Sequence, residues 1–287
     1  MSNRQGRFYD TNYALAAAFS GGDWTLALPL DNLKTTRLAS QPARSSGLDA
    51  ADTQFDIDFG RVRKLSIMAA LATNITSGAK YRLRLAQSAD FASPEYDTGW
   101  VQAYASLFES ADLDWEDENW WTGQPLEGDI AAYNRNIFVQ MEPAIQATHA
   151  RFEFLDASNP ELALDIGHLF ASGGLQPEFN FNFGTPRGFR SRTLRDVTPS
   201  GRAVFDRRPL QRVARFDYDA LNKGEAVLFQ DAAARNDIED PVLFVPDPGD
   251  EANLFREAFL ARFERLPDRI PRASGNSIQL QFEEVIS

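Results

Sequence analysis

The chain has 287 residues, of which 43% are hydrophobic and 24% charged, so it can form one large folded domain or two ordinary ones. Its net charge of −12 argues against general affinity for nucleic acid, and its apolar runs are too short to cross a bilayer. Cysteine is absent, which excludes disulfides, cysteine zinc sites and thiol catalysis, and leaves His149 and His168 as the only imidazoles.

The acidic excess lies in the first part of the chain. Residues 1–172 contain 13 Lys and Arg against 23 Asp and Glu, a net charge of −10, whereas residues 173–287 contain 16 against 18, a net charge of −2. This change supports a domain boundary near Gly173-Gly174.

The N-terminus carries basic residues but lacks an apolar stretch long enough for a signal peptide, so we expect folding in a cytoplasm. Residues 1–24 are predicted to form an N-terminal arm. Within it, residues 10–19 could form a short helix with Asp10 or Thr11 as the N-cap.

Residues 25–172 have the pattern of a β-sandwich. Residues 55–59 and 81–85 alternate apolar and polar side chains, which is typical of strands with one buried face. Residues 65–71 are almost continuously apolar, as in a central strand. Further strands are predicted at residues 137–141, 150–155 and 162–170. Many short strands separated by turn residues favour a sandwich over alternating strands and helices.

A series of short motifs follows the same order as in a known family. Asn32-Leu33 precedes Phe-Asp-Ile-Asp-Phe-Gly at 55–60 and Ala-Thr-Asn-Ile-Thr at 72–76, and the series closes on Asp-Thr-Gly-Trp at 97–100. This order resembles the galactose-binding-like (discoidin-type) jelly roll of tailed-phage virion proteins. The resemblance implies a jelly-roll β-sandwich over residues 25–172.

Residues 112–121 hold five carboxylates and three tryptophans, the strongest local anomaly in composition. Indole rings can stack on a sugar while Asp and Asn bond its hydroxyls, and carboxylates also suit Ca²⁺, although the spacing of an EF-hand is absent. The alternative to ligand binding is a protein–protein contact or a loop folded over the sandwich with its tryptophans buried. The predicted ligand-binding residues are Asp114, Trp115, Asn119, Trp120 and Trp121.

Catalytic motifs do not emerge from the sequence. His149 and His168 lack motif partners, the Ser-Gly pairs are turn chemistry, and Gly173-Gly174 lacks the lysine and spacing of a phosphate-binding loop. Paired carboxylates within 112–118 could serve a glycoside hydrolase, but such pairs are common in solvated loops. We therefore expect a non-enzyme without a metal or cofactor.

Residues 173–287 are predicted to form a second, smaller β-rich domain with one or two short helices. Strands are expected at 179–183, 212–218, 241–246 and 277–286, and a helix at 224–235, while 251–263 fits a helix or a strand. Pro-Val-Leu-Phe-Val-Pro-Asp at 241–247 and Phe-Leu-Ala-Arg-Phe at 259–263, with the final strand, resemble minor tail and distal-tail-like phage proteins. That resemblance implies a tail-assembly domain.

The second domain also contains an arginine-rich segment. Arginines interleaved with Phe189 could follow single-stranded nucleic acid, but the acidic chain favours salt bridges to neighbouring copies. The predicted interchain residues are Arg187, Arg190, Arg192 and Arg195.

Two functions from different classes fit these features. The first is a structural component of a phage tail tip or baseplate, located in the virion and assembled in the host cytoplasm. It would form a hexameric or trimeric ring, dock other tail and fibre proteins, and touch host-surface glycan, without nucleic acid or membrane insertion. The second is a stand-alone carbohydrate-binding lectin or accessory glycan-binding module. The first is preferred because it accounts for both resemblances.

Overall fold

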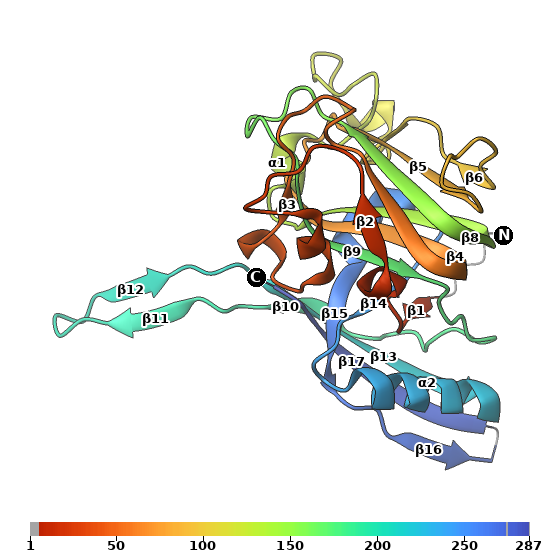
Figure 1. Cartoon of the computed structure of the whole chain (residues 1–287). Helices are drawn as coiled ribbons and strands as arrows, with labels where there is room; N and C mark the ends of the chain where they lie inside the picture. Colours follow the sequence, from red (N-terminus) through yellow and green to blue (C-terminus); the bar gives the residue numbers. More distant parts are fainter. Residues whose placement is uncertain (1–5, 274, 287) are drawn as a thin grey trace. The chain divides into compact units, whose positions relative to one another are not determined.

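The computed structural model describes residues 6–273 and 275–286. It divides into two compact units (Figure 1). The first unit comprises residues 6–175 and 245–259, and the second comprises residues 176–244 and 260–286.

The first unit is mainly β. Its strands are β1 (Arg7–Tyr9), β2 (Ala18–Ser20), β3 (Ala43–Arg44), β4 (Phe55–Thr73), β5 (Lys80–Ala86), β6 (Tyr96–Asp97), β7 (Val101–Gln102), β8 (Arg135–Leu155) and β9 (Asp165–Ser172). Single-turn helices join them: η1 (Tyr13–Ala16), η2 (Leu30–Lys34), η3 (Leu38–Ser40), η4 (Ser110–Asp112), α1 (Glu127–Ile130), η5 (Glu251–Asn253) and α3 (Leu254–Glu257).

Two long strands, β4 and β8, organise this unit and lie side by side in Figure 1. The first half of β4 pairs with β2 and with the second half of β8, where Phe55 lies opposite Phe152, and β5 continues that layer. The second half of β4 lies between β9 and the first half of β8, where Met68 faces Ala171 and Val139. Register shifts separate the two halves, so each long strand takes part in both layers.

A single hydrophobic core fills the space between the layers. It contains Phe55, Leu83 and Phe152 from the first layer and Met68, Ile137 and Leu169 from the second. Phe152 and Phe154 stack with ring centroids 5.0 Å apart. Because both layers contribute inward-facing side chains to one core, the unit is a β-sandwich, and the predicted jelly-roll fold class is confirmed.

The observed units differ from the predicted ranges at two places. Residues 6–24, predicted as an arm, belong to the first unit: Phe19 on β2 pairs with Ile57, and Asn12 is buried and caps η1. Residues 245–259, predicted in the second domain, also belong to the first unit, because Phe255 is buried edge-on against Tyr104 and Tyr133. An apolar ring is stabilised where it finds partners, whatever its place in the chain.

The second unit is a sheet covered by one helix. Its elements are β10 (Arg187–Arg190), β11 (Leu194–Val197), β12 (Ala203–Asp206), β13 (Gln211–Leu221), α2 (Lys223–Asn236), β14 (Val242–Val245), β15 (Phe259–Arg265), β16 (Arg269–Arg272) and β17 (Gly275–Glu284). The strand order is β14-β15-β17-β13-β10, with β16 also on β17. β11 and β12 pair with each other as a separate two-stranded ribbon.

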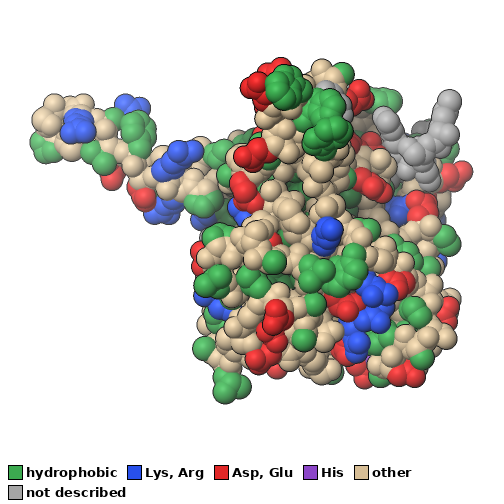
Figure 2. Space-filling model, turned by 90° about the horizontal axis from the view of Figure 1, so that it is seen from above, with side chains coloured by type: hydrophobic (Ala, Val, Ile, Leu, Met, Phe, Trp, Pro, Cys, Tyr) green, Lys and Arg blue, Asp and Glu red, His purple; other side chains and the backbone are tan. Residues whose placement is uncertain are grey.

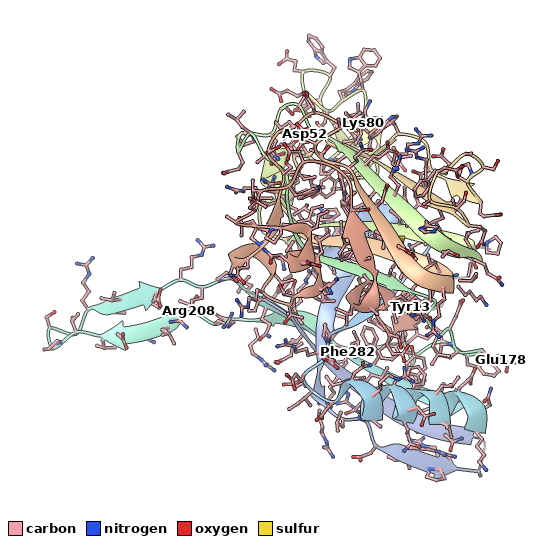
Figure 3. The ribbon with its side chains drawn as sticks, in the orientation of Figure 1. Tyr13, Asp52, Lys80, Glu178, Arg208 and Phe282 are labelled. Carbon is pink, nitrogen blue, oxygen red and sulfur yellow. The ribbon has the colours of Figure 1, made fainter. Side chains whose placement is uncertain are left out.

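Helix α2 begins where local chemistry predicts it. The Asn222 side chain accepts from the Glu225 amide at 2.9 Å, while the Glu225 carboxylate accepts from the Asn222 amide at 3.0 Å, which forms a capping box. Phe229 on the buried face packs on Tyr218, with centroids 5.4 Å apart. The core continues through Phe282 on β17, which is labelled in Figure 3.

The strand predicted at 179–183 is not formed. Phe181 packs on Phe216 with centroids 4.8 Å apart, but Phe179 and Phe183 are exposed. The alternating pattern therefore did not correspond to a buried sheet face, because only the middle ring finds a partner in the core.

Candidate binding site

The first unit contains a cleft of about 580 Å³ at one edge of the sandwich. Its wall combines Tyr81 on β5, Tyr96 on β6, Gln102 on β7 and Gln140 on β8 with residues 251–255. The chain segments that form it are far apart in the sequence, and the pairing of β5 with β6, β7 and β8 brings part of them together. The cleft lies within the usual size range for small-molecule sites.

Amides and hydroxyls dominate the polar part of the cleft. They belong to Thr98, Gln102, Ser106, Thr122, Gln124, Asn136 and Gln140. The Asn136 side-chain oxygen accepts from the Ala72 amide at 2.9 Å, and the Gln140 side-chain nitrogen donates to the Pro248 carbonyl at 3.0 Å. These contacts fix the two amides in place, so their orientation is set before any ligand arrives.

Two buried polar atoms of the lining residues lack a hydrogen-bond partner among the described residues: the Tyr104 hydroxyl and the Gln140 side-chain oxygen. Buried polar groups in native proteins are nearly always partnered, so these two atoms keep unused hydrogen-bonding capacity beside the cleft. Gln140 is anchored through its side-chain nitrogen, while its side-chain oxygen is buried.

Aromatic rings provide the apolar part of the cleft. Burial, the neighbouring Tyr96 and the Glu251 carboxylate raise the pKa of Tyr81, and burial and Glu251 raise the pKa of Tyr96. Burial likewise raises the pKa of Tyr104. The tyrosines therefore keep their protons at neutral pH and can donate hydrogen bonds. Glu251 is the one charged side chain among the described lining residues.

The loop of residues 105–126 borders the cleft through Ser106, Thr122 and Gln124. The buried Asn119 holds this loop together: its side-chain nitrogen donates to the Gln124 carbonyl at 2.7 Å, and its carbonyl accepts from the Gly123 amide at 2.7 Å. Asn119 therefore shapes the loop, and its role as a ligand contact stays a prediction.

The tryptophans of this loop differ in exposure. Trp115 and Trp121 are 78% and 87% exposed, and Trp120 is half-buried with its ring 4.5 Å from that of Trp121, edge to face. Asp114 is exposed and forms a tight turn in which its amide donates to the Asp117 carboxylate at 2.8 Å. The exposed indoles exclude the alternative of a loop folded down with all its tryptophans buried.

None of the five predicted ligand residues lines the cleft, although their neighbours Thr122 and Gln124 do. The sequence interpretation missed Tyr81, Gln102 and Gln140 because each lies in an ordinary-looking strand. A signal was nevertheless present, since Tyr96 begins the Tyr-Asp-Thr-Gly-Trp motif at 96–100. The cleft depends on strand pairing, which local patterns do not reveal.

The predicted interchain arginines fall into two groups. Arg190 forms ion pairs inside its own unit, at 2.5 Å to Glu264 and 3.1 Å to Glu283, and Arg187 lies over the Phe216 ring at 5.6 Å. Arg192 and Arg195 are exposed on the β11–β12 ribbon.

Within residues 6–273 and 275–286, His, Asp and Glu side chains form no group of three or more that could hold a metal ion. The described part of the chain also contains no helix that is long and apolar enough to cross a membrane.

No protein-family model matches the chain, and no curated protein matches its sequence. Among solved structures, it is similar to a fucose-binding module of Streptococcus pneumoniae, with 9% identity, a TM-score of 0.34, and coverage of 56% of this chain and 96% of that chain. It is also similar to the family 32 carbohydrate-binding module of NanJ from C. perfringens in complex with galactose. The identity is 13%, the TM-score is 0.36, and the match covers 58% of this chain and 98% of that chain. A third similar structure is the lectin domain of lectinolysin complexed with Lewis B antigen. The identity is 9%, the TM-score is 0.35, and the match covers 56% of this chain and 95% of that chain.

The first two of these structures are binding modules and the third is a lectin domain. Similarities at such TM-scores carry no argument about what this chain binds.

Proposed function

We propose that the first unit is a carbohydrate-binding module and that its cleft holds a neutral oligosaccharide. The observation that carries the proposal is the lining: several fixed amides and hydroxyls beside Tyr81, Tyr96 and Tyr104, with one carboxylate. Sugar hydroxyls need many donors and acceptors, while the apolar faces of pyranose rings pack on aromatic rings. The proposal thus favours the alternative function over the tail-tip role.

The cleft is suited to binding and not to hydrolysis. Glycoside hydrolysis generally takes two carboxyl groups on opposite sides of the scissile bond. Glu251 is the one carboxylate among the described lining residues, and neither histidine lines the cleft. A ligand would therefore be held without bond cleavage.

The test is a glycan array with the full chain, followed by calorimetric titration of the best ligand. Tyr96→Phe removes one hydroxyl from the cleft, and we expect its Kd to rise about two- to tenfold, the value of one neutral hydrogen bond. Tyr13→Phe makes the same chemical change outside the cleft and should leave the Kd unchanged. An array without a bound glycan would overturn the proposal, as would equal effects of the two variants.

One observation, the projecting β11–β12 ribbon, favours a second candidate function. We propose, as the alternative, that the chain is a structural component of a tail tip or baseplate in a virion and assembles as a ring. The ribbon supports an assembly role because it presents exposed apolar and basic side chains away from its own sheet. Copurification of the chain with tail particles tests that location.

A further inference from the structure

The ribbon formed by β11 and β12, here called the arm (residues 191–207), pairs with no other strand of the described chain. Its turn is closed by the Thr198 amide, which donates to the Arg202 carbonyl at 2.9 Å. Figure 1 shows the arm projecting as a free ribbon from β10 and β13. Two-stranded ribbons are marginally stable in water, so a projecting one is stabilised by a partner.

The register of the arm gives its two faces different chemistry. Leu194 lies opposite Asp206 and Asp196 opposite Val204, so one face carries both carboxylates. The other face consists of the pairs Arg195–Phe205 and Val197–Ala203. This second face, here called the contact face, is apolar with positive charge only.

The exposure of the contact face agrees with a docking role. Val197 and Phe205 are 61% and 63% exposed, and Figure 2 shows hydrophobic and basic side chains interleaved along the arm. Arg195 on this face, and Arg192, Arg202 and Arg207 elsewhere on the arm, are exposed and form no ion pair with the described part of the chain. Unpaired guanidinium groups beside apolar side chains suit an acidic partner with aromatic rings.

A surface of that chemistry exists on the chain itself. The acidic loop, residues 109–121, contains six Asp and Glu and no Lys or Arg, and it exposes Trp115 and Trp121. Arginine forks match carboxylates and stack on indoles, and Phe205 can pack against the same rings. Two contact faces would not pair with each other, since both carry positive charge.

We infer that the arm of one copy docks through its contact face onto the acidic loop of a second copy of this chain. The contact joins two different surfaces, so it is heterologous and builds a ring or a filament and not a two-fold dimer. Because Arg–carboxylate pairs contribute to it, association weakens as salt rises. The inference is independent of the sugar cleft.

The first measurement is the mass of the full chain by light scattering behind a sizing column, across concentration, at about 0.1 M and about 1 M salt. We expect larger species at low salt that dissociate at high salt. A chain that stays monomeric at every concentration and salt would overturn the inference.

Charge reversal identifies the surfaces. Arg195→Glu with Arg207→Glu on the arm, or Asp114→Lys with Glu116→Lys on the loop, should each raise the dissociation constant at least about tenfold. A chain carrying all four changes should assemble again, because the charges are complementary once more. If the fourfold variant stays monomeric although circular dichroism shows it folded, the pairing of arm with loop is wrong.

A matched control reverses two exposed charges of the first unit, Arg61→Glu with Lys64→Glu, which changes net charge equally and should leave the mass unchanged. Trp121→Ala distinguishes the role of the acidic loop in association from the role of the cleft in glycan binding. We expect weaker association with unchanged glycan affinity. The reverse pattern would assign the indole to the sugar site and overturn the inference.

Discussion

His168 couples the stability of the first unit to pH through two buried hydrogen bonds. Its Nδ1 lies 2.9 Å from the Thr35 carbonyl, which can only accept, so Nδ1 carries the proton. Its Nε2 lies 3.1 Å from the Asn12 side-chain nitrogen, which can only donate, so Nε2 must accept. The ring is fully buried, and the folded state therefore requires neutral imidazole.

The size of this effect on the free energy of unfolding follows from the pKa of His168. Burial lowers the pKa of His168 from 6.5 to about 4, although the bond to Thr35 opposes the change. Between these values the unfolded chain binds a proton that the folded chain does not, so the stabilisation is complete above about pH 6.5 and is lost as pH falls to about 4. The interval corresponds to about 3 kcal/mol of unfolding free energy.

The assay is urea unfolding of the wild type and of His168→Gln at several pH values from 7.5 to 4. Glutamine does not titrate, so the wild type should lose about 3 kcal/mol more than the variant over this range. His149→Gln leaves the His168 contacts intact and serves as the matched control. Parallel pH profiles for the wild type and His168→Gln would refute the reasoning.

Three further changes test the packing. Glu284→Ala leaves the buried Arg212 guanidinium without its 2.5 Å partner and should destabilise the second unit by about 3–5 kcal/mol; an effect below about 1 kcal/mol in chemical unfolding would contradict the burial of this pair. Gly123→Ala places a Cβ 2.3 Å from the Phe108 carbonyl oxygen at a φ of +62°, so the melting temperature should fall while a surface Gly128→Ala control changes little. Phe255→Ala should cost about 3–5 kcal/mol and weaken glycan binding; unchanged binding would remove residues 251–255 from the site.

The fold was predictable wherever the pattern was local. Alternation at 55–59 and 81–85 identified β4 and β5, and the helix expected at 224–235 matches α2 to within one residue at each end. Where one strand continues into the next was harder to predict. Segments 55–59 and 65–71 appeared as two strands but form the single bent β4, since the register shift that joins them depends on the partner β8.

The candidate site shows the same division. The anomaly at 112–121 drew the prediction to the tryptophans, and the structure exposes Trp115 and Trp121 but assigns Asn119 to the interior of the loop. The cleft escaped prediction because Tyr81 and Gln140, far apart in the sequence, line the same cleft only in the folded unit. Long-range contacts of this kind leave no periodic trace in the sequence.

The sequence by itself determined the mainly β class, the acidic first part, the arginine-rich segment that leads into the arm and the absence of cysteine chemistry. These properties depend on composition and on periods of two or four residues, which act over neighbouring positions. Only the tertiary structure decided that Phe255 closes the first unit, that His168 is buried neutral and that the arm stands free of its sheet. Each of these is a matter of which distant surfaces pack together, and burial free energy, summed over the whole fold, makes that choice.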